Sequence, residues 1–192
     1  AGLLLEREKN FLSRALNNYE SPYVAVIGGA KVSTKLELIK CISSVADYVI
    51  VGGGIANTFL KASGLNIGKS LVENSMINTA KDLLEKGKII LPNKVITSKT
   101  FEGEDIKEIS VGDVSDEEMI LDLDLNEETI ELIAQAKTIL WNGPIGVFEN
   151  SAFSKGTRNL SEAIANSEAF SLAGGGETLL AINKYIKPDD VS

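Results

Sequence analysis

Histidine is missing altogether from the 192-residue chain. Serine or cysteine nucleophiles that depend on a histidine base are therefore excluded, as are the usual zinc sites with histidine ligands. Any chemistry has to use lysine, carboxylates, amides or a loosely held metal ion.

Cysteine is almost as scarce, because Cys41 is the only one in the chain. No disulfide can form within the chain, and Cys41 lies in an apolar helical pattern with Leu38, Ile42 and Val45. Free cysteines are often buried, so we expect a core residue rather than a reactive thiol.

Long apolar runs and an excess of positive charge are missing too. No stretch approaches the roughly 20 apolar residues of a membrane-spanning helix. The first residues reach Glu6 and Arg7 too soon for a signal-peptide core. The net charge of −8 argues against nucleic-acid binding, which needs clustered lysine and arginine. We therefore expect a cytoplasmic protein with neither membrane nor nucleic acid as a partner.

What the chain does contain is a regular alternation of short β-rich runs and longer helical patterns. The predicted strands are 23–28, 48–52, 88–92, 94–98, 119–123, 138–142 and 169–174. The predicted helices lie near 34–45, 55–63, 73–86, 127–136, 156–166 and 177–186. Such alternation with near-continuous apolar strands is typical of a parallel sheet covered on both faces. We predict a doubly wound, Rossmann-like α/β fold of three layers.

The domain organisation is predicted to be simple. Residues 2–17 have the apolar periodicity of an amphipathic helix, and this helical pattern ends before Pro22. No linker and no repeat is visible after that point. We therefore expect a connecting helix over residues 1–18 and one α/β domain over residues 19–192.

Four predicted strands end in glycine-rich turns, in VIGGAKVSTK, VIVGGGIANTF, TILWNGPIGVFE and SLAGGGETLLA. Glycine lets a ligand approach the backbone, and a following helix offers free amides and its positive dipole end to a phosphate. In a doubly wound sheet, ligands bind outside the carboxyl ends of the strands. One such turn would be weak support, but four at one edge favour a phosphate-containing ligand.

Lys31 and Lys35 follow the first of these turns. Their spacing brings both ammonium groups toward one side of a helix, and the capping-box spacing of Thr34 and Glu37 predicts that this helix starts near Thr34. Cations at a helix N-terminus oppose the dipole, which favours a bound anion over two plainly solvated lysines. A purely structural domain would need the four turns and both lysines to be incidental.

Two familiar nucleotide-binding fingerprints do not fit. The segment GLNIGKS, residues 64–70, has three residues between its glycines where a P-loop has four, and no strand precedes it. Lys69 is therefore interpreted as a solvated loop residue. VGGGIANTF has Asn57 where a dinucleotide fingerprint has its third glycine, so a Rossmann dehydrogenase is a poor fit.

A family resemblance rests on VIGGAKVSTKLELI, VGGGIANTFLKA, IGKSL, AKTILWNGPIGVFE, FSKGT and AGGGET. In this order and spacing they resemble the C-terminal, nucleotide-binding domain of phosphoglycerate kinases. The resemblance implies phosphoryl transfer between 1,3-bisphosphoglycerate and MgADP, giving 3-phosphoglycerate and MgATP. It also implies that a separate N-terminal domain holds the triose and that closure of the two domains brings the substrates together. The resemblance further implies a monomer, and a chain that continues beyond the position of Ser192 into a strand and a glycine-rich turn.

The resemblance also implies roles for individual residues. The adenine pocket would be lined by Gly29, Ala30, Gly53, Gly54, Leu71, Pro144 and Val147. Glu149 would accept hydrogen bonds from the ribose hydroxyls, while Lys31 and Asn142 would lie at the nucleotide phosphates. The transferring phosphoryl group would meet Lys35 and the amides of Gly175, Gly176 and Thr178.

The chain departs from the family pattern at Glu177, where the family has an aspartate that binds the Mg²⁺ of the nucleotide. Mg²⁺ prefers a tight octahedral shell with one or two carboxylates. The longer glutamate arm is expected to bind through a water or to shift the metal, which alters the metal dependence.

Two functions remain open at this stage. The chain is either the nucleotide-binding half of a kinase, inactive alone, or a stand-alone nucleotide-binding module without catalysis. For Trp141, inside a predicted strand of a sheet covered on both faces, we expect a core position rather than a stacking platform for the base.

Overall fold

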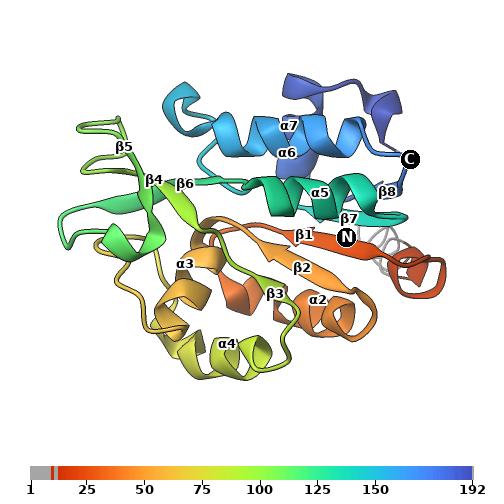
Figure 1. The fold of residues 1–192 in the computed structure, drawn as a ribbon, viewed down its shortest axis with the longest axis horizontal. Helices are drawn as coiled ribbons and strands as arrows, with labels where there is room; N and C mark the ends of the chain where they lie inside the picture. Colours follow the sequence, from red (N-terminus) through yellow and green to blue (C-terminus); the bar gives the residue numbers. More distant parts are fainter. Residues whose placement is uncertain (1–9, 11–12, 192) are drawn as a thin grey trace.

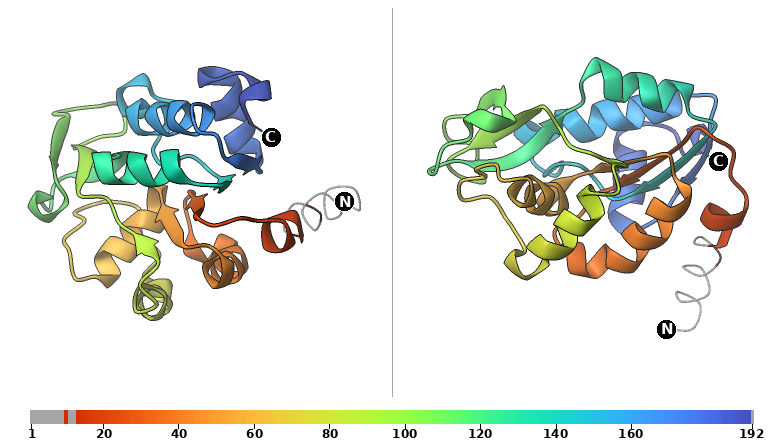
Figure 2. Two further views of the ribbon diagram at one scale, coloured as in Figure 1. Left: turned by 45° about the vertical axis from the view of Figure 1, so that its right-hand side comes forward. Right: turned by 60° about the horizontal axis from the view of Figure 1, so that its bottom comes forward.

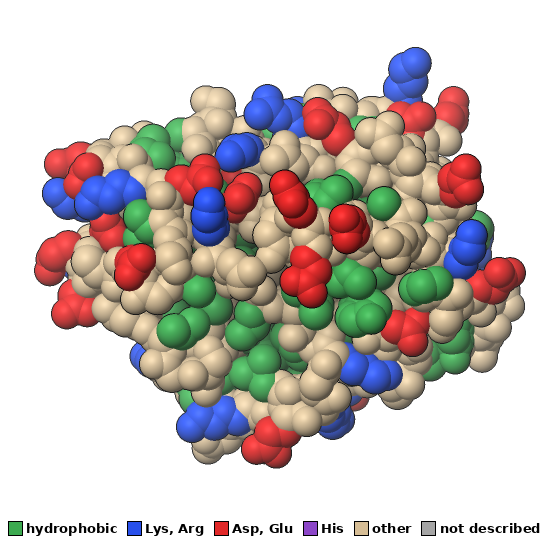
Figure 3. Space-filling model, in the orientation of Figure 1, with side chains coloured by type: hydrophobic (Ala, Val, Ile, Leu, Met, Phe, Trp, Pro, Cys, Tyr) green, Lys and Arg blue, Asp and Glu red, His purple; other side chains and the backbone are tan. Residues whose placement is uncertain are grey.

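The computed structural model describes residues 10 and 13–191. Residues 13–17 are helical, and the rest of the connecting helix expected up to residue 18 lies largely outside the described residues. Among the described residues, no helix is long and apolar enough to cross a bilayer. Acidic and basic side chains are interspersed over the face seen in Figure 3.

The main sheet has five parallel strands in the order β3-β2-β1-β7-β8 (Figure 1). Its strands are β1 (Tyr23–Ile27), β2 (Tyr48–Val51), β3 (Ile89–Ile90), β7 (Thr138–Asn142) and β8 (Phe170–Ala173). The chain winds outward from β1 to β3 and then returns to add β7 and β8 on the other side. This confirms the predicted doubly wound α/β fold, and it makes the β1/β7 junction the point where the strand order reverses.

Helices cover both faces of this sheet. They are α2 (Val32–Val45), α3 (Gly53–Ala62), α4 (Ile77–Leu84), α5 (Glu127–Gln135), α6 (Lys155–Ala165) and α7 (Gly176–Tyr185). Short 3-10 turns lie at η1 (Asn74–Met76), η2 (Val111–Asp113), η3 (Ser151–Phe153) and η4 (Pro188–Asp190). Figure 1 shows α2, α3 and α4 on one side and α5 and α6 on the other, and α7 packs against α6. The result is the predicted three-layer arrangement.

Two predicted strands of the sheet, 94–98 and 119–123, belong elsewhere. They form a separate antiparallel sheet in the order β5-β4-β6, with β4 (Lys94–Ser98), β5 (Lys107–Ser110) and β6 (Met119–Asp124). Parallel pairing needs a long crossover, usually a helix. The chain between β4 and β6 supplies only β5 and a short turn, so neighbouring strands pair antiparallel. This small sheet lies at one end of the molecule (Figure 2).

The core lies where the sheet meets its helices. All five residues of β1 are buried, and Trp141 on β7 has no exposed surface. Its indole Nε1 donates to the carbonyl of Gly143 at 3.0 Å, so the expectation of a core tryptophan is confirmed. Cys41 on α2 is only partly buried, whereas a core position was expected.

The start of α2 differs from the capping-box prediction. The helix begins at Val32, and the Thr34 hydroxyl donates to the carbonyl of Lys31 at 2.8 Å instead of capping a new turn. The cap comes from a distant segment, because Glu73 accepts hydrogen bonds from the backbone N–H of Ser33, at 2.8 Å, and from its hydroxyl. These bonds hold the pKa of Glu73 below its ordinary value. A carboxylate already occupies this helix N-terminus.

Candidate functional site

The four glycine-rich turns meet at one edge of the main sheet. Each follows one of the strands β2, β1, β7 and β8, which are neighbours and run parallel, so their carboxyl ends lie side by side. The sequence-based expectation of one shared edge is therefore confirmed. This edge includes the β1/β7 junction, where ligands of doubly wound sheets bind.

The turns pack backbone against backbone. A Cβ on Gly28 would lie 1.8 Å from the carbonyl oxygen of Pro144, and a Cβ on Gly54 would lie 2.2 Å from that of Ala30. Hydrogen bonds join the same turns, from Ile55 N to Gly29 O at 3.0 Å and from Gly53 N to Ile145 O at 3.1 Å. Only glycine permits this close approach.

Beside these turns lies a pocket of about 200 Å³. It is lined by nine of the residues that the resemblance assigns to the nucleotide, namely Gly29, Ala30, Gly53, Gly54, Leu71, Pro144, Val147, Glu149 and Glu177. The wall is mainly apolar, with carboxylates at Glu149 and Glu177. A mainly apolar wall with a few polar groups is the usual composition of a small-molecule pocket.

The opposite wall of the pocket comes from the small sheet and its loops. It is formed by residues 119–123 of β6 and by Phe101, while Asn57 on α3 and Lys69 in the loop after α3 also line the pocket. Sequence analysis did not assign these residues to the site, because it placed β6 in the parallel sheet. Lys69 is exposed in a loop as expected and forms an ion pair with Glu117, yet it also lines the pocket.

Phe101 lines the pocket from the loop between β4 and β5, with 57% of its surface exposed. An aromatic residue in the polar, glycine-containing run TFEGED is the one signal that could have identified it in the sequence. The side-chain amide of Asn150 donates to the carbonyl of Phe101 at 2.9 Å. This bond ties the loop to the chain next to Glu149.

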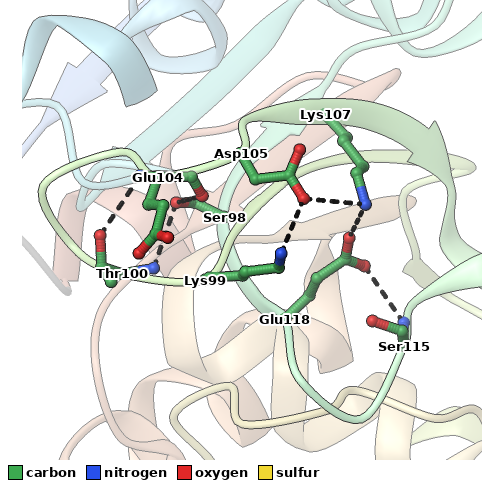
Figure 4. Close-up of polar contacts among 8 residues, drawn as sticks. All are labelled: Ser98, Lys99, Thr100, Glu104, Asp105, Lys107, Ser115 and Glu118. Carbon is green, nitrogen blue, oxygen red and sulfur yellow. Dashed lines mark hydrogen bonds and ion pairs between the residues drawn. The ribbon is translucent and has the colours of Figure 1, made fainter.

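A charged network holds the other end of this loop (Figure 4). Asp105 lies 3.1 Å from the ammonium of Lys99 and 3.3 Å from that of Lys107. Lys107 also contacts Glu118 at 2.7 Å, and the Glu118 side chain is only 3% exposed. The hydrogen bond from Lys107 is the main cause that lowers the pKa of Glu118. A buried carboxylate paired in this way keeps the loop base in one arrangement.

The remaining assigned residues lie beside the pocket, at the ends of β1, β7 and β8. Lys35 does not reach outward, because its ammonium donates to Gly28 O at 2.7 Å and to Asn142 O and Oδ1 at 3.0 and 2.5 Å. Burial lowers the pKa of Lys35, and the charge of Glu177 partly offsets this. Lys31 is exposed at the N-cap of α2. The two lysines therefore occupy different environments, one exposed and one bonded to the turns.

The N-terminus of α7 offers free backbone amides to an anion. Thr178 is buried and its hydroxyl is committed to protein, since it accepts from Gly143 N and donates to Gly174 O, both at 2.7 Å. Its backbone N–H stays in the first turn of α7, which has no side-chain cap. Gly175 has a φ of 98°, and a Cβ on Gly176 would meet no atom within 4 Å. This end contrasts with α2, which Glu73 caps.

Asp122 is a carboxyl on the pocket wall that sequence analysis missed. It has 1% of its surface exposed, and its Oδ2 accepts from Gly156 N at 2.8 Å. Its Oδ1 has no hydrogen-bond partner among the described residues and fills the space that a Cβ on Gly146 would need. Burial, and to a lesser degree the charge of Asp124, raise the pKa of Asp122 to about 7, although the Gly156 and Leu123 amides and Lys155 oppose the shift.

We expect Asp122→Asn to flatten the pH dependence of stability. The folded-state pKa of about 7 exceeds the ordinary value of 3.8. The wild-type chain therefore loses stability as pH rises from about 4 to about 7, where the unfolded chain ionises first. The free energy of unfolding of the wild-type chain should fall by at most a few kcal/mol over this pH range. Urea unfolding of both chains at pH 5, 6, 7 and 8 measures it, and parallel curves would contradict the assignment.

The donor set for a metal ion is sparse. Among residues 10 and 13–191, no group of three or more histidine, cysteine or acidic side chains could hold a metal. Glu177 offers a single exposed carboxylate in the first turn of α7. One carboxylate fits a Mg²⁺ ion that takes its other oxygens from phosphates and water, and does not fit an ion held by protein alone.

Comparisons with known proteins agree with this geometry. Residues 1–192 match the family model described as phosphoglycerate kinase. The phosphoglycerate kinase of Blochmanniella floridana is 52% identical over 189 residues, which is 96% of this chain and 47% of the relative. That of Vibrio campbellii is 49% identical over 195 residues, which is 100% of this chain and 50% of the relative. The chain spans about half the length of these curated relatives.

Solved structures show the same similarity. A phosphoglycerate kinase from Coxiella burnetii superposes with a TM-score of 0.91 at 47% identity, over 98% of this chain and 51% of that one. The enzyme from Pyrococcus horikoshii gives a TM-score of 0.77 at 32% identity, over 95% of this chain and 49% of that one. The similarity thus covers both the sheet and its glycine-rich edge.

Proposed function

The chain belongs to the phosphoglycerate kinase family, and from this premise we propose that it is the nucleotide-binding half of a glycolytic phosphoglycerate kinase. The reaction would transfer a phosphoryl group between 1,3-bisphosphoglycerate and MgADP, giving 3-phosphoglycerate and MgATP. The observation that carries the proposal is the meeting of four glycine-rich turns beside one pocket. Protein chains use such an edge to bring phosphates close to backbone amides.

The nucleotide would lie across this edge. The base would enter the apolar pocket between the glycine turns and β6, with Leu71 and Val147 on its walls. Glu149 would accept hydrogen bonds from the ribose hydroxyls. The phosphates would then extend toward Lys31, Asn142 and the uncapped first turn of α7, where amides and the helix dipole favour negative charge.

Phosphoryl transfer asks mainly for positioning and charge neutralisation, so a chain without histidine is suited to it. Lys35 would stabilise the charge on the transferring group together with the amides of Gly175, Gly176 and Thr178. To do so, its ammonium has to exchange at least one of its three protein oxygens for a phosphate oxygen. The hydrogen bonds of Lys35 thus hold a cation ready beside the phosphate path.

Mg²⁺ would be held through the Glu177 carboxylate. When bound, the ion neutralises phosphate charge and orients the nucleotide oxygens. The charge of Glu177 already acts on Lys35, since it raises the pKa of that ammonium and partly offsets the effect of burial. As the nucleotide binds, the negative charge of Glu177 would balance the metal ion and the positive charge of Lys35 would balance the phosphates.

The other partner would be the triose, bound by the half of the relatives' length that this chain does not span. We propose that the complete protein is a monomeric cytoplasmic enzyme and that this chain alone binds nucleotide without turning it over. Catalysis by the purified chain in a coupled assay would contradict the last statement.

Calorimetric titration of MgADP into the chain tests the nucleotide site. We expect saturable binding that Lys31→Ala and Glu149→Ala each weaken by about tenfold, because each removes one charge-assisted hydrogen bond. Circular dichroism of each variant serves as the folding control. Absence of binding to a folded wild-type chain would refute the proposed site.

A further inference from the structure

The turn over residues 143–150 is the part of the site that most elements contact. Three of its backbone N–H groups donate to other elements, Gly143 N to the Thr178 hydroxyl at 2.7 Å, Ile145 N to the Thr157 hydroxyl at 3.2 Å, and Val147 N to the carbonyl of Leu121 at 2.8 Å. These bonds connect the turn to α7, α6 and β6. The first half of the turn is therefore fixed by neighbours on both walls of the pocket.

The second half is held by a hydrogen bond from Asn150 N to the carbonyl of Val147 at 3.1 Å and by contacts with one cation. Lys184, near the end of α7, donates from Nζ to the carbonyl of Phe148 at 2.8 Å. The Tyr185 hydroxyl approaches the same oxygen at 3.4 Å. The ammonium also lies 5.6 Å from the centre of the Phe148 ring and 5.3 Å from that of Tyr185. A carbonyl and two aromatic rings thus contact the positive charge of a lysine that is otherwise exposed.

The bonded carbonyl belongs to the peptide that joins Phe148 to Glu149. The Phe148 side chain is 3% exposed, so the residue before Glu149 is anchored through both its ring and its carbonyl. Glu149 itself lines the pocket, and Asn150 after it holds the Phe101 loop. The direction of the Glu149 side chain consequently depends on a peptide plane that Lys184 holds.

We propose that Lys184 is a positioning residue of the nucleotide site, which fixes the Phe148–Glu149 peptide so that the Glu149 carboxylate faces the nucleoside. This inference rests on the proposed function. Both ends of α7 would then contribute to the nucleotide site. The first turn would present backbone amides to the phosphates, and Lys184 in the last turn would orient Glu149 at the ribose. Over ten residues these ends lie about 15 Å apart.

A plainer role for Lys184 is to complement the dipole at the C-terminus of α7. The two roles differ in what a substitution changes. Loss of a dipole partner lowers stability and affects every ligand alike, whereas loss of a positioning contact affects only ligands that reach Glu149. Comparison of a nucleotide with a bare phosphate chain separates them.

The test uses Lys184→Met, which keeps the aliphatic stem over the rings but removes the charge and the donor. Calorimetry would measure the dissociation constants of MgADP and of magnesium tripolyphosphate with the 192-residue chain. We expect the constant for MgADP to rise about tenfold, the typical effect of one charged hydrogen bond, and the constant for tripolyphosphate to change less than about twofold. Lys184→Arg should recover most of the affinity, and Lys81→Met, an exposed lysine on α4, is the matched control.

A double-mutant cycle with Glu149→Ala shows whether Lys184 acts through Glu149. In the Glu149→Ala background, Lys184→Met should change the MgADP constant by less than about twofold, because the contact it positions is already gone. An equal loss for both ligands, an unchanged MgADP constant, or additive losses in the cycle would each overturn the inference while leaving the proposed function intact. Failure of the wild-type chain to bind MgADP would overturn both.

Discussion

Replacement of Gly28 by alanine should disrupt the carboxyl edge of the sheet and remove nucleotide binding. The new Cβ would lie 1.8 Å from the carbonyl oxygen of Pro144, 2.7 Å from its carbonyl carbon and 2.9 Å from that of Gly143. All three are backbone atoms, so no side-chain rotation relieves the clash. β1 and β7 pair up to Ile27 and Asn142, directly before these turns, and would have to separate.

The expected cost is at least the upper end of the roughly 1–3 kcal/mol typical of overpacking. Urea unfolding measures the free energy of unfolding, and calorimetry measures the MgADP affinity of the folded fraction. Gly112→Ala is the matched control, because a Cβ there meets no atom within 4 Å, and it should change stability by less than about 0.5 kcal/mol. Equal stability of the two variants would mean that the β1 and β7 turns do not touch in solution.

Replacement of Lys35 by methionine should lower both stability and nucleotide affinity. Its ammonium supplies hydrogen bonds to Gly28 O and to both oxygens of Asn142, and methionine removes all three, so that among the described residues only Asn142 O keeps another donor, Gly28 N at 2.9 Å. Such a loss typically costs about 1–3 kcal/mol. Nucleotide affinity should fall as well, by about tenfold or more, because the proposed role of the same cation is to contact the transferring phosphoryl group.

Lys31→Met is the natural comparison for Lys35→Met. Lys31 is exposed at the start of α2, so its replacement should weaken MgADP binding but change the free energy of unfolding by less than about 0.5 kcal/mol. Urea unfolding gives the free energy of unfolding of each variant, and calorimetry gives the MgADP dissociation constant of each. If both variants retain wild-type stability, the inward hydrogen bonds of Lys35 contribute nothing to the folded chain.

Local pattern in the sequence was enough to predict most elements of the fold. Apolar runs followed by glycine predicted β1, β2, β7 and β8 to within a residue or two of their observed bounds. These strands can be recognised from their own residues, because a strand buried on both faces is a nearly continuous apolar run. The glycine-rich turns and nine of the pocket residues followed from the same segments and from the family resemblance.

The antiparallel sheet could not be predicted in this way. β5 has the polar run KEIS, with three exposed residues out of four, so nothing in its composition marks a strand. β4 and β6 look like members of the parallel sheet, since pairing direction is decided by the connection and the partner rather than by the strand itself. For that reason the β6 wall of the pocket, including Asp122, was missed.

The sequence by itself determined the parallel sheet, its glycine-rich edge and the identity of the cations beside it, because these depend on short-range pattern. Tertiary structure alone decided what each charge does. Glu73 caps α2 from 40 residues away, Lys35 turns inward to Asn142 across 107 residues, and Lys184 reaches Phe148 across 36. Such contacts depend on distances between segments that only the folded chain brings together.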